Sequence, residues 1–228
     1  MDSTPEPTAG PDLRAVWLGR RSFADVLALQ LTARDELVAG GQPTLFLVEH
    51  PPVLTLGRRA SPEDILWTDE QLAAAGVEVA ETPRGGQVTL HAPGQLVAYP
   101  VVHVGRKIRE HIVRLGRVAT TLLAELGVTG HEFRMEHPGV WLGDQAQGAV
   151  ERKLASIGIH VSRGVSVQGI SINLDVDPGL FAALVSCGLH GVEVTSATAV
   201  GGRKISVEAA ARRFAELFAE DAGFSLRW

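Results

Sequence analysis

The sequence predicts a mixed α+β (α/β) fold, in which a largely antiparallel sheet is flanked by helices. Segments with apolar residues at helical spacing and shorter strand-like runs follow one another without the regular alternation that produces a parallel sheet. With 228 residues, 45% of them hydrophobic, the chain can bury one good core. A single catalytic domain is therefore expected over residues 13–228.

The N-terminal half contains most of the predicted strands. Residues 1–12 are Pro, Thr, Gly and acids, which predicts a disordered tail. Residues 23–39 have helical periodicity, and Gly40-Gly41 ends that helix. A second helix is expected to begin at Ser61, followed by Pro62 and two acids. The predicted strands cover residues 13–18, 44–49, 53–56, 77–81, 88–90 and 96–102, with Pro51-Pro52 separating the second from the third.

The C-terminal half begins with a long amphipathic helix, expected over residues 108–126 and ended by Gly127. Its predicted strands cover residues 139–142, 154–161 and 166–174, the first two joined by a loop at residues 143–148. A short helix is expected at residues 177–185. The last helix is expected at residues 207–222, starting at Ser206 and stopping at Gly223.

Composition excludes several classes of function. The formal charge is −5 without a long basic run, so a nucleic-acid partner has no support. One cysteine cannot form an internal disulfide, and no Cys and His cluster has zinc-ligand spacing. The first residues do not resemble a signal peptide, and no apolar run has membrane-spanning length. These features predict a cytoplasmic protein without a membrane or metal partner.

Cys187, the only cysteine, and Lys153, 34 residues before it, are candidate catalytic residues. A thiol beside an ammonium is held as thiolate, the form that attacks acyl carbonyls, which points to an acyl transferase. Gly188 would let a backbone N–H turn toward a developing oxyanion. The alternatives are that Cys187 is an inert small hydrophobic residue and that Lys153 is a solvated residue at the start of a strand.

The segment Arg84-Gly85-Gly86-Gln87-Val88-Thr89-Leu90-His91 is too glycine-rich and too polar to fill a core. It could be a tight hairpin connection or a loop that contacts a ligand. Thr89, His91 and Gln95 clustered behind the turn favour the ligand-contacting loop. The other histidines considered, which are His103, His131, His137, His160 and His190, are interpreted as structural.

Standard motifs of several enzyme classes are absent from the sequence. It has no Gly-x-Ser-x-Gly elbow, P-loop, dinucleotide-binding glycine motif or His-Glu-x-x-His. Serine hydrolases of the common fold, nucleotide kinases, Rossmann dehydrogenases and zincins are therefore not favoured.

Over residues 18–194 the sequence resembles the lipoyl(octanoyl) transferases, the octanoyl-[acyl-carrier-protein]:protein N-octanoyltransferases of lipoate biosynthesis. The motifs that carry the resemblance are LVEHPPV at 47–53, RGGQVTLH at 84–91, PGQLVAYP at 93–100, PGVW at 138–141, KLASIG at 153–158 and the stretch 169–188.

The resemblance implies the fold of biotin and lipoate protein ligases and an enzyme that needs no cofactor. In such an enzyme Cys187 would take an octanoyl group from acyl carrier protein as a thioester and pass it to a lysine of a lipoyl domain. The acceptors would be lipoyl domains of 2-oxoacid dehydrogenases and the glycine cleavage H protein. Lys153 would lower the pKa of the thiol and move protons. The implied substrate-binding residues are Arg84, Gly85, Gly86, Gln87, Val88, Thr89, Leu90, His91, Ser156, Ile157, Gly158, Gly169, Ile170 and Ser171.

Three positions depart from the pattern of that family: Ala92 stands where Gly is common, Gln168 where His is common, and Ser186 where Pro is common. A glutamine cannot titrate near neutrality, which argues against proton transfer at position 168. Two rival functions remain. An ATP-dependent lipoate or biotin ligase of the same fold would need ATP and no nucleophilic cysteine, whereas a binding module would hold acylated proteins without forming an adduct.

Overall fold

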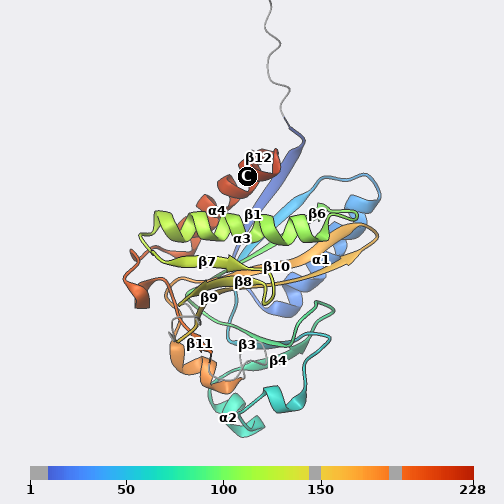
Figure 1. The fold of residues 1–228 in the computed structure, drawn as a ribbon. Helices are drawn as coiled ribbons and strands as arrows, with labels where there is room; N and C mark the ends of the chain where they lie inside the picture. Colours follow the sequence, from blue (N-terminus) through green and yellow to red (C-terminus); the bar gives the residue numbers. More distant parts are fainter. Residues whose placement is uncertain (1–9, 144–149, 185–191) are drawn as a thin grey trace, which may run out of the picture.

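The computed structural model describes residues 10–143, 150–184 and 192–228 (Figure 1). Most of the predicted loop at 143–148, and Cys187 with its neighbours Ser186 and Gly188, lie outside the described residues. Most of the predicted N-terminal tail also lies outside them, and the first strand begins at Asp12.

A large mixed sheet forms the centre of the molecule, with strand order β12-β1-β2-β6-β10-β9-β8-β7 and with β11 paired to β9. Neighbouring strands are antiparallel along the series β2, β6, β10, β9, β8 and β7. In contrast, β1 pairs in parallel with β2 and with β12. The prediction of a largely antiparallel sheet is thus confirmed. Its strands are β1 (Asp12–Arg20), β2 (Thr44–Glu49), β6 (Gln95–His103), β7 (His131–Arg134), β8 (Gly139–Leu142), β9 (Arg152–Ser162), β10 (Val165–Asn173), β11 (Glu193–Val194) and β12 (Ser225–Arg227).

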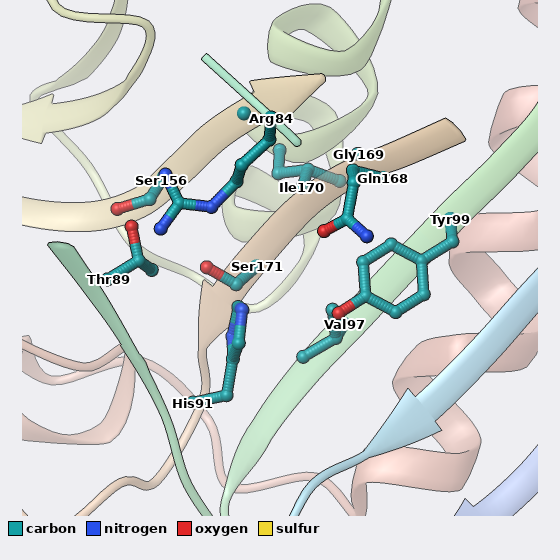
Figure 2. A pocket seen from close by; sticks show the side chains of 11 residues that line it. Arg84, Thr89, His91, Val97, Tyr99, Ser156, Gln168, Gly169, Ile170 and Ser171 are labelled. Atoms are coloured by element: carbon teal, nitrogen blue, oxygen red, sulfur yellow. The ribbon is translucent and has the colours of Figure 1, made fainter. Parts of the chain in front are cut away.

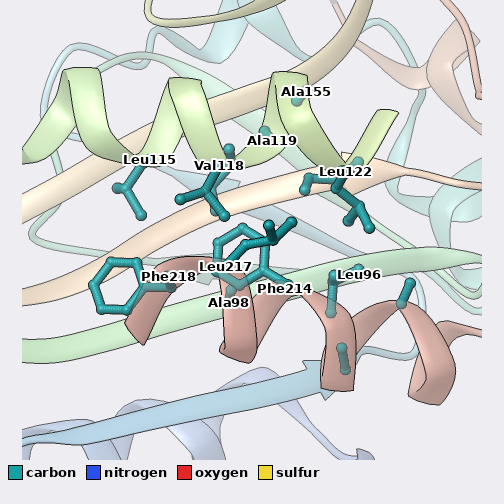
Figure 3. Packing of buried hydrophobic residues seen from close by; sticks show 14 of the residues in the cluster. Leu96, Ala98, Leu115, Val118, Ala119, Leu122, Ala155, Phe214, Leu217 and Phe218 are labelled. Carbon is teal, nitrogen blue, oxygen red and sulfur yellow. The ribbon is translucent and has the colours of Figure 1, made fainter. Parts of the chain in front are cut away.

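Helices α3 (Ile108–Glu125) and α4 (Val207–Ala222) cover one face of the large sheet, and α1 (Phe23–Val38) packs on the other (Figure 1). Leu115 and Leu122 of α3 meet Phe214 and Phe218 of α4 above the sheet (Figure 3). The two faces of β6 explain why this strand is almost continuously apolar: Leu96 belongs to the core under α3 and α4, and its neighbours on the opposite face belong to the core under α1.

A second sheet, of order β4-β3-β5, lies on the α1 side of the large sheet. It consists of β3 (Val53–Leu56), β4 (Glu78–Glu81) and β5 (Val88–His91), and the short helix α2 (Asp69–Ala74) packs against it through Leu72. Proline has no N–H for a ladder, and Pro51-Pro52 is the point at which the chain leaves β2 in one sheet and enters β3 in the other.

Two predicted helices are 3₁₀ turns. The helix expected from Ser61 ends after Pro62–Asp64, because Ile65 turns extended and bridges to Leu184. The helix expected at 177–185 is the 3₁₀ helix Pro178–Ala183. The remaining 3₁₀ segment described here is Thr198–Val200.

A proline in the central strand β6 has a visible consequence on β10. Pro100 pairs with β2 but offers no N–H to the other side, and the opposite residues of β10 are distorted. Gln168 has a φ of 62°, and its backbone N–H donates to Oε1 of Gln30 on α1 instead of to β6. The next residue is Gly169, where a Cβ would lie 2.1 Å from the carbonyl oxygen of Ala98. This distortion lies beside the site described below.

None of the helices in the described part of the chain is long and apolar enough to cross a membrane.

Candidate functional site

Two adjoining pockets lie between the large sheet and the second sheet. Their floor is made by small residues that face one another in the β9–β10 ladder, where Ser156 pairs with Ser171 and Gly158 pairs with Gly169. Because these side chains are small, the sheet leaves room where larger residues would fill the space against β5. The Tyr99 pocket, as we call it, is lined by Arg84, Thr89, His91, Val97, Tyr99, Ser156, Gly158, Gln168, Gly169, Ile170 and Ser171 (Figure 2).

The second pocket, here called the Lys153 pocket, shares Arg84, Thr89 and Ser156 with the first. The two pockets therefore meet at the Arg84 side chain. The Lys153 pocket is lined by Arg59, Arg84, Gly85, Gly86, Gln87, Val88, Thr89, Glu136, His137, Pro138, Lys153, Ser156 and Ile157.

The glycine-rich segment is not a hairpin turn. β4 and β5 lie on opposite sides of β3, so residues 82–87 cross over the end of β3 instead of joining two paired strands. Arg84 is only 5% exposed, and its Nη2 donates to the carbonyl oxygen and the hydroxyl of Thr55 at 2.6 and 2.9 Å. Its Nη1 donates to the Gly85 carbonyl oxygen at 3.0 Å. A buried guanidinium needs such acceptors.

Gly158 gives Arg84 its place on β9. A Cβ at this position would lie 2.9 Å from Cδ of Arg84, and the Gly85 N–H donates to the Ile159 carbonyl oxygen at 3.1 Å. The loop is thus held against β9 by one backbone hydrogen bond and one close side-chain approach.

A β-bulge turns Lys153 into the site. Trp141 of β8 pairs with Lys153, and the preceding Val140 pairs with Ala155, so Leu154 is an extra residue on β9. Leu154 and Ala155 consequently both point into the core under α3 and α4. Lys153 is left on the pocket face with Ser156, where regular alternation would have placed it in the core.

Lys153 is only 2% exposed, so the alternative of a solvated lysine is wrong. Its Nζ lies 4.6 Å from the centroid of the Trp141 ring, which stabilises an ammonium there by a cation–π interaction. Trp141 is fixed in turn, because its Nε1–H donates to the His137 carbonyl oxygen at 3.0 Å. Gly139 makes room for the lysine, since a Cβ at 139 would lie 2.7 Å from Cε of Lys153.

Two buried histidines near the Tyr99 pocket are neutral: His91 lines this pocket, and His50 contacts the hydroxyl of Tyr99. Burial lowers the pKa of His50 to about 4, and burial together with neighbouring His50 and Arg84 lowers that of His91 to about 3. His50 Nδ1–H donates to the Arg21 carbonyl oxygen at 2.7 Å, so its Nε2 accepts from the Tyr99 hydroxyl at 3.0 Å. Burial raises the pKa of Tyr99, which therefore remains a hydrogen-bond donor.

The structure brings the predicted substrate-binding residues together around the two pockets, with one exception. Leu90 points away from both and packs in the core of the second sheet. Sequence reasoning missed Tyr99 and Val97, which line the Tyr99 pocket, and Trp141, which contacts Lys153; all three lay inside apolar runs interpreted as strands. It also missed His137, which was interpreted as structural but lines the Lys153 pocket. Strand register, which the sequence does not display, determines on which face of the sheet Tyr99, Val97 and Trp141 lie, whereas His137 lies in the turn between β7 and β8.

Gln168 also lines the Tyr99 pocket, with its amide directed toward the Tyr99 ring (Figure 2). It is 1% exposed, and its Nε2 has no hydrogen-bond partner among the residues that the structure describes. In the same described ranges, no group of three or more His, Cys, Asp or Glu side chains is arranged to hold a metal ion.

Cys187 itself lies outside the described residues, but both flanks of its segment end near Lys153. On the C-terminal side, β11 pairs in parallel with β9, with Val194 opposite Lys153, and the Thr195 N–H donates to the Lys153 carbonyl oxygen at 3.0 Å. On the N-terminal side, Leu184 lines a small hollow together with Ser156 and Val194.

The fold is similar to that of solved lipoate ligases. A bipartite lipoate protein ligase from Thermoplasma acidophilum, solved with its E2 lipoyl domain, superposes with a TM-score of 0.71 at 14% identity, over 96% of this chain and 86% of that one. A lipoate-protein ligase A bound with ATP gives a TM-score of 0.70 at 13% identity, over 96% of this chain and 87% of that one. The predicted biotin/lipoate protein ligase-like fold is thus confirmed.

Sequence comparison is more specific. The family model described as the lipoyl protein ligase A/B catalytic domain matches residues 22–219. An octanoyltransferase from Maridesulfovibrio salexigens is 37% identical over 88% of this chain and 92% of its own length. One from Mycolicibacterium smegmatis is 38% identical over 87% of this chain and 84% of its own length.

A third relative is longer. An octanoyltransferase from Myxococcus xanthus is 40% identical over 88% of this chain, and the chain spans 58% of that protein's length. These matches run through both pockets and through the segment that contains Cys187. The chain therefore belongs to the octanoyltransferase family, acyltransferases that share the lipoyl protein ligase A/B catalytic domain.

Proposed function

We propose that this enzyme transfers an octanoyl group from octanoyl-acyl carrier protein to a lysine of lipoyl domains through a thioester on Cys187. The observation that carries the proposal is the buried Lys153, which a β-bulge turns onto the wall of a pocket that also contains Arg84 and Ser156. A buried lysine on a pocket wall can exchange a proton with groups bound there.

In the first step, Lys153 in its amine form accepts the proton of the Cys187 thiol, which produces a thiolate and an ammonium. The thiolate attacks the thioester carbonyl of the donor, a new carbon–sulfur bond forms, and the bond to the carrier thiol breaks. The departing thiolate takes the proton from the Lys153 ammonium. The products are an octanoyl thioester on Cys187, a free carrier thiol and a neutral Lys153.

In the second step, the amine of the acceptor lysine attacks the Cys187 thioester. The nitrogen loses a proton to Lys153, the carbon–sulfur bond breaks, and the thiolate and ammonium are restored. Support comes from the strand partners of the lysine: Val194 pairs with Lys153 and is only seven residues from Cys187 in the sequence. Leu184, three residues before Cys187, lines a hollow with Ser156.

The pockets support the acyl part of the proposal. With the exception of Leu90, the residues from Arg84 to His91, Ser156 to Gly158 and Gly169 to Ser171 would bind the donor acyl group, with its thioester at the Lys153 pocket and its alkyl chain directed toward the Tyr99 pocket. The neutral His91 suits an alkyl chain, because no imidazolium charge has to be desolvated against it. Acceptor lipoyl domains, including those of 2-oxoacid dehydrogenases and the glycine cleavage H protein, are supported by the family and by the ligase of similar fold that was solved with an E2 lipoyl domain.

Intact-protein mass spectrometry tests the mechanism. The enzyme is incubated with octanoyl-acyl carrier protein, and one added octanoyl group is expected, which disappears when a lipoyl domain is added. The Cys187→Ser variant is the matched control and should show no thioester and almost no transfer. Substantial turnover by that variant would refute the covalent mechanism.

The same assay separates the rival functions. An ATP-dependent ligase would transfer octanoate in the presence of ATP and would not use the carrier-bound group. A binding module would form no adduct, or would hold an acylated protein without transfer. Transfer from the carrier protein without ATP is the result expected here.

A further inference from the structure

A continuous chain of hydrogen bonds joins the pocket wall to the strand that carries Lys153. His91 Nδ1 lies 2.7 Å from Gln95 Oε1, and Gln95 Nε2 donates to Asn173 Oδ1 at 2.8 Å. Asn173 Nδ2 donates to the Thr195 carbonyl oxygen at 2.9 Å. The Thr195 N–H donates to the Lys153 carbonyl oxygen at 3.0 Å, so the chain runs from β5 through β6 and β10 to β9.

The hydrogen bond to the Thr195 carbonyl determines which group donates and which accepts in every other hydrogen bond of this chain. The Thr195 carbonyl can only accept, so Asn173 must present its NH₂ group there and its oxygen to Gln95. Gln95 must then present its NH₂ group to Asn173, and the same group also donates to the Leu90 carbonyl oxygen at 3.3 Å. The Gln95 oxygen is left to face His91, and an oxygen there requires a proton on Nδ1. A neutral His91 therefore has an unprotonated Nε2.

The surroundings of His91 disfavour its charged form. The ring stacks on Phe23 at a centroid distance of 6.3 Å and lies 5.6 Å from the ring of His50. His50 and Arg84 are the titratable and charged groups that face it among the described residues, and both oppose an added positive charge. Gln95 is 1% exposed and Asn173 is 5% exposed, so water does not replace the amides.

We propose that Gln95 and Asn173 are positioning residues of the acyl-transfer site. Their amides hold His91 as the Nδ1–H tautomer, with Nε2 on the wall of the Tyr99 pocket, and they connect that wall to the strand edge at Lys153. The part of the wall that His91 forms thereby stays uncharged beside the acyl chain. The assignment of an acyl chain to this pocket rests on the proposed function, whereas the tautomer does not.

The tautomer is measured directly by two-bond ¹H–¹⁵N correlation NMR on the full-length ¹⁵N-labelled enzyme at pH 7. The His91 signals are assigned by their loss in His91→Gln. The expected result is a protonated Nδ1 and the downfield shift of an unprotonated Nε2. A protonated Nε2 on His91 would overturn the proposal, even if the enzyme transfers octanoyl groups as proposed.

The matched pair Gln95→Glu and Gln95→Met separates positioning from a structural role. A carboxylate in place of the amide raises the pKa of His91, and both of its nitrogens should be protonated at pH 6 in Gln95→Glu. KM for the octanoyl donor should then rise roughly tenfold, because a charge is buried against the alkyl chain, and the rise should shrink toward pH 8. In Gln95→Met any rise in KM should not depend on pH. An equal, pH-independent rise in KM in both variants would overturn the proposal.

Asn173→Asp tests the connection to Lys153. An aspartate still accepts from Gln95 but cannot donate to the Thr195 carbonyl. The His91 signals should be unchanged, and kcat should fall severalfold without a matching change in KM. An unchanged kcat would refute the connection. If the unmodified enzyme shows the expected tautomer and no octanoyl transfer, the proposed function fails while the assignment of Gln95 and Asn173 to His91 stands.

Discussion

Replacement of Gly139 by alanine tests the way in which this fold positions Lys153. A Cβ at 139 would lie 2.2 Å from the Ala155 carbonyl oxygen and 2.7 Å from Lys153 Cε. The lysine side chain can move aside, but the carbonyl belongs to the backbone of β9. A return to an ordinary contact of 3.4 Å requires a displacement of about 1.2 Å in the strand that carries Lys153.

Two effects of different kinds follow from that displacement. Overpacking of this type costs roughly 1 to 3 kcal/mol of unfolding free energy. A catalytic group that is misplaced by about 1 Å loses on the order of a hundredfold in rate. Gly139→Ala should therefore remain folded at 25 °C, because the loss is smaller than the stability of a typical domain, and its kcat should fall far more than the lost stability explains.

Urea unfolding and steady-state octanoyl transfer measure the two effects. Gly85→Ala is the control for stability, since among the described residues only the Ile159 carbonyl oxygen, at 4.0 Å, comes that near to its added Cβ. The free energy of unfolding of this control should lie within about 0.5 kcal/mol of that of the parent enzyme. A Gly139→Ala enzyme with the stability and kcat of the parent would show that β9 does not hold Lys153 by this close approach.

Three further predictions concern the thiol, the acyl pocket and the core. Lys153→Met should raise the pH midpoint for alkylation of Cys187 by a small uncharged reagent, and an unchanged midpoint would remove Lys153 from the mechanism. Carrier-protein thioesters of six to sixteen carbons test the acyl pocket. From eight carbons to six, kcat/KM should fall about fifteenfold, because two buried methylenes are worth about 1.6 kcal/mol, and for chains several carbons longer than eight it should fall more sharply. A flat profile would exclude a length-measuring pocket. His111 packs edge-on against Phe218, and neither of its ring nitrogens is hydrogen-bonded within the described chain. Because burial lowers the pKa of His111 to about 4, the free energy of unfolding should fall as the pH drops from about 6.5 to 4. His111→Leu should reduce that dependence and stabilise the protein by about 1 to 3 kcal/mol in urea unfolding; an equally steep profile would contradict the assignment to His111.

The helices with complete end signals were predictable from the sequence. α1 and α4 begin after serines whose side chains accept from the backbone N–H three residues on, and α4 ends at Gly223 in the left-handed conformation. The same type of signal was misleading at Ser61, which has a complete capping box followed by only one 3₁₀ turn. A cap stabilises a first turn, but the next turns depend on packing, and Ile65 instead joins Leu184.

Short polar strands were not predictable. β7 is four residues long, its side chains are mixed in polarity, and among the described strands it pairs with β8 alone, at the edge of the sheet. β12 has three residues and pairs only with β1. Neither segment has enough residues to show a period of two, so only the tertiary pairing reveals it.

At the site, as in the fold, features that depend on local sequence pattern were predictable and features that depend on strand register were not. The motif that contains Arg84 and His91 identified the pocket loop, because glycine and polar residues in that number do not fill a core. The role of Lys153 depends on the face of β9 to which it belongs, and a single extra residue, Leu154, reverses that face. A count of alternating positions places Lys153 beside Ala155 in the core, whereas the bulge places it beside Ser156. The pairing of Trp141 with Lys153 thus places this lysine on the pocket face of β9. Gly139 and the Thr195 hydrogen bond contact the same short stretch of backbone.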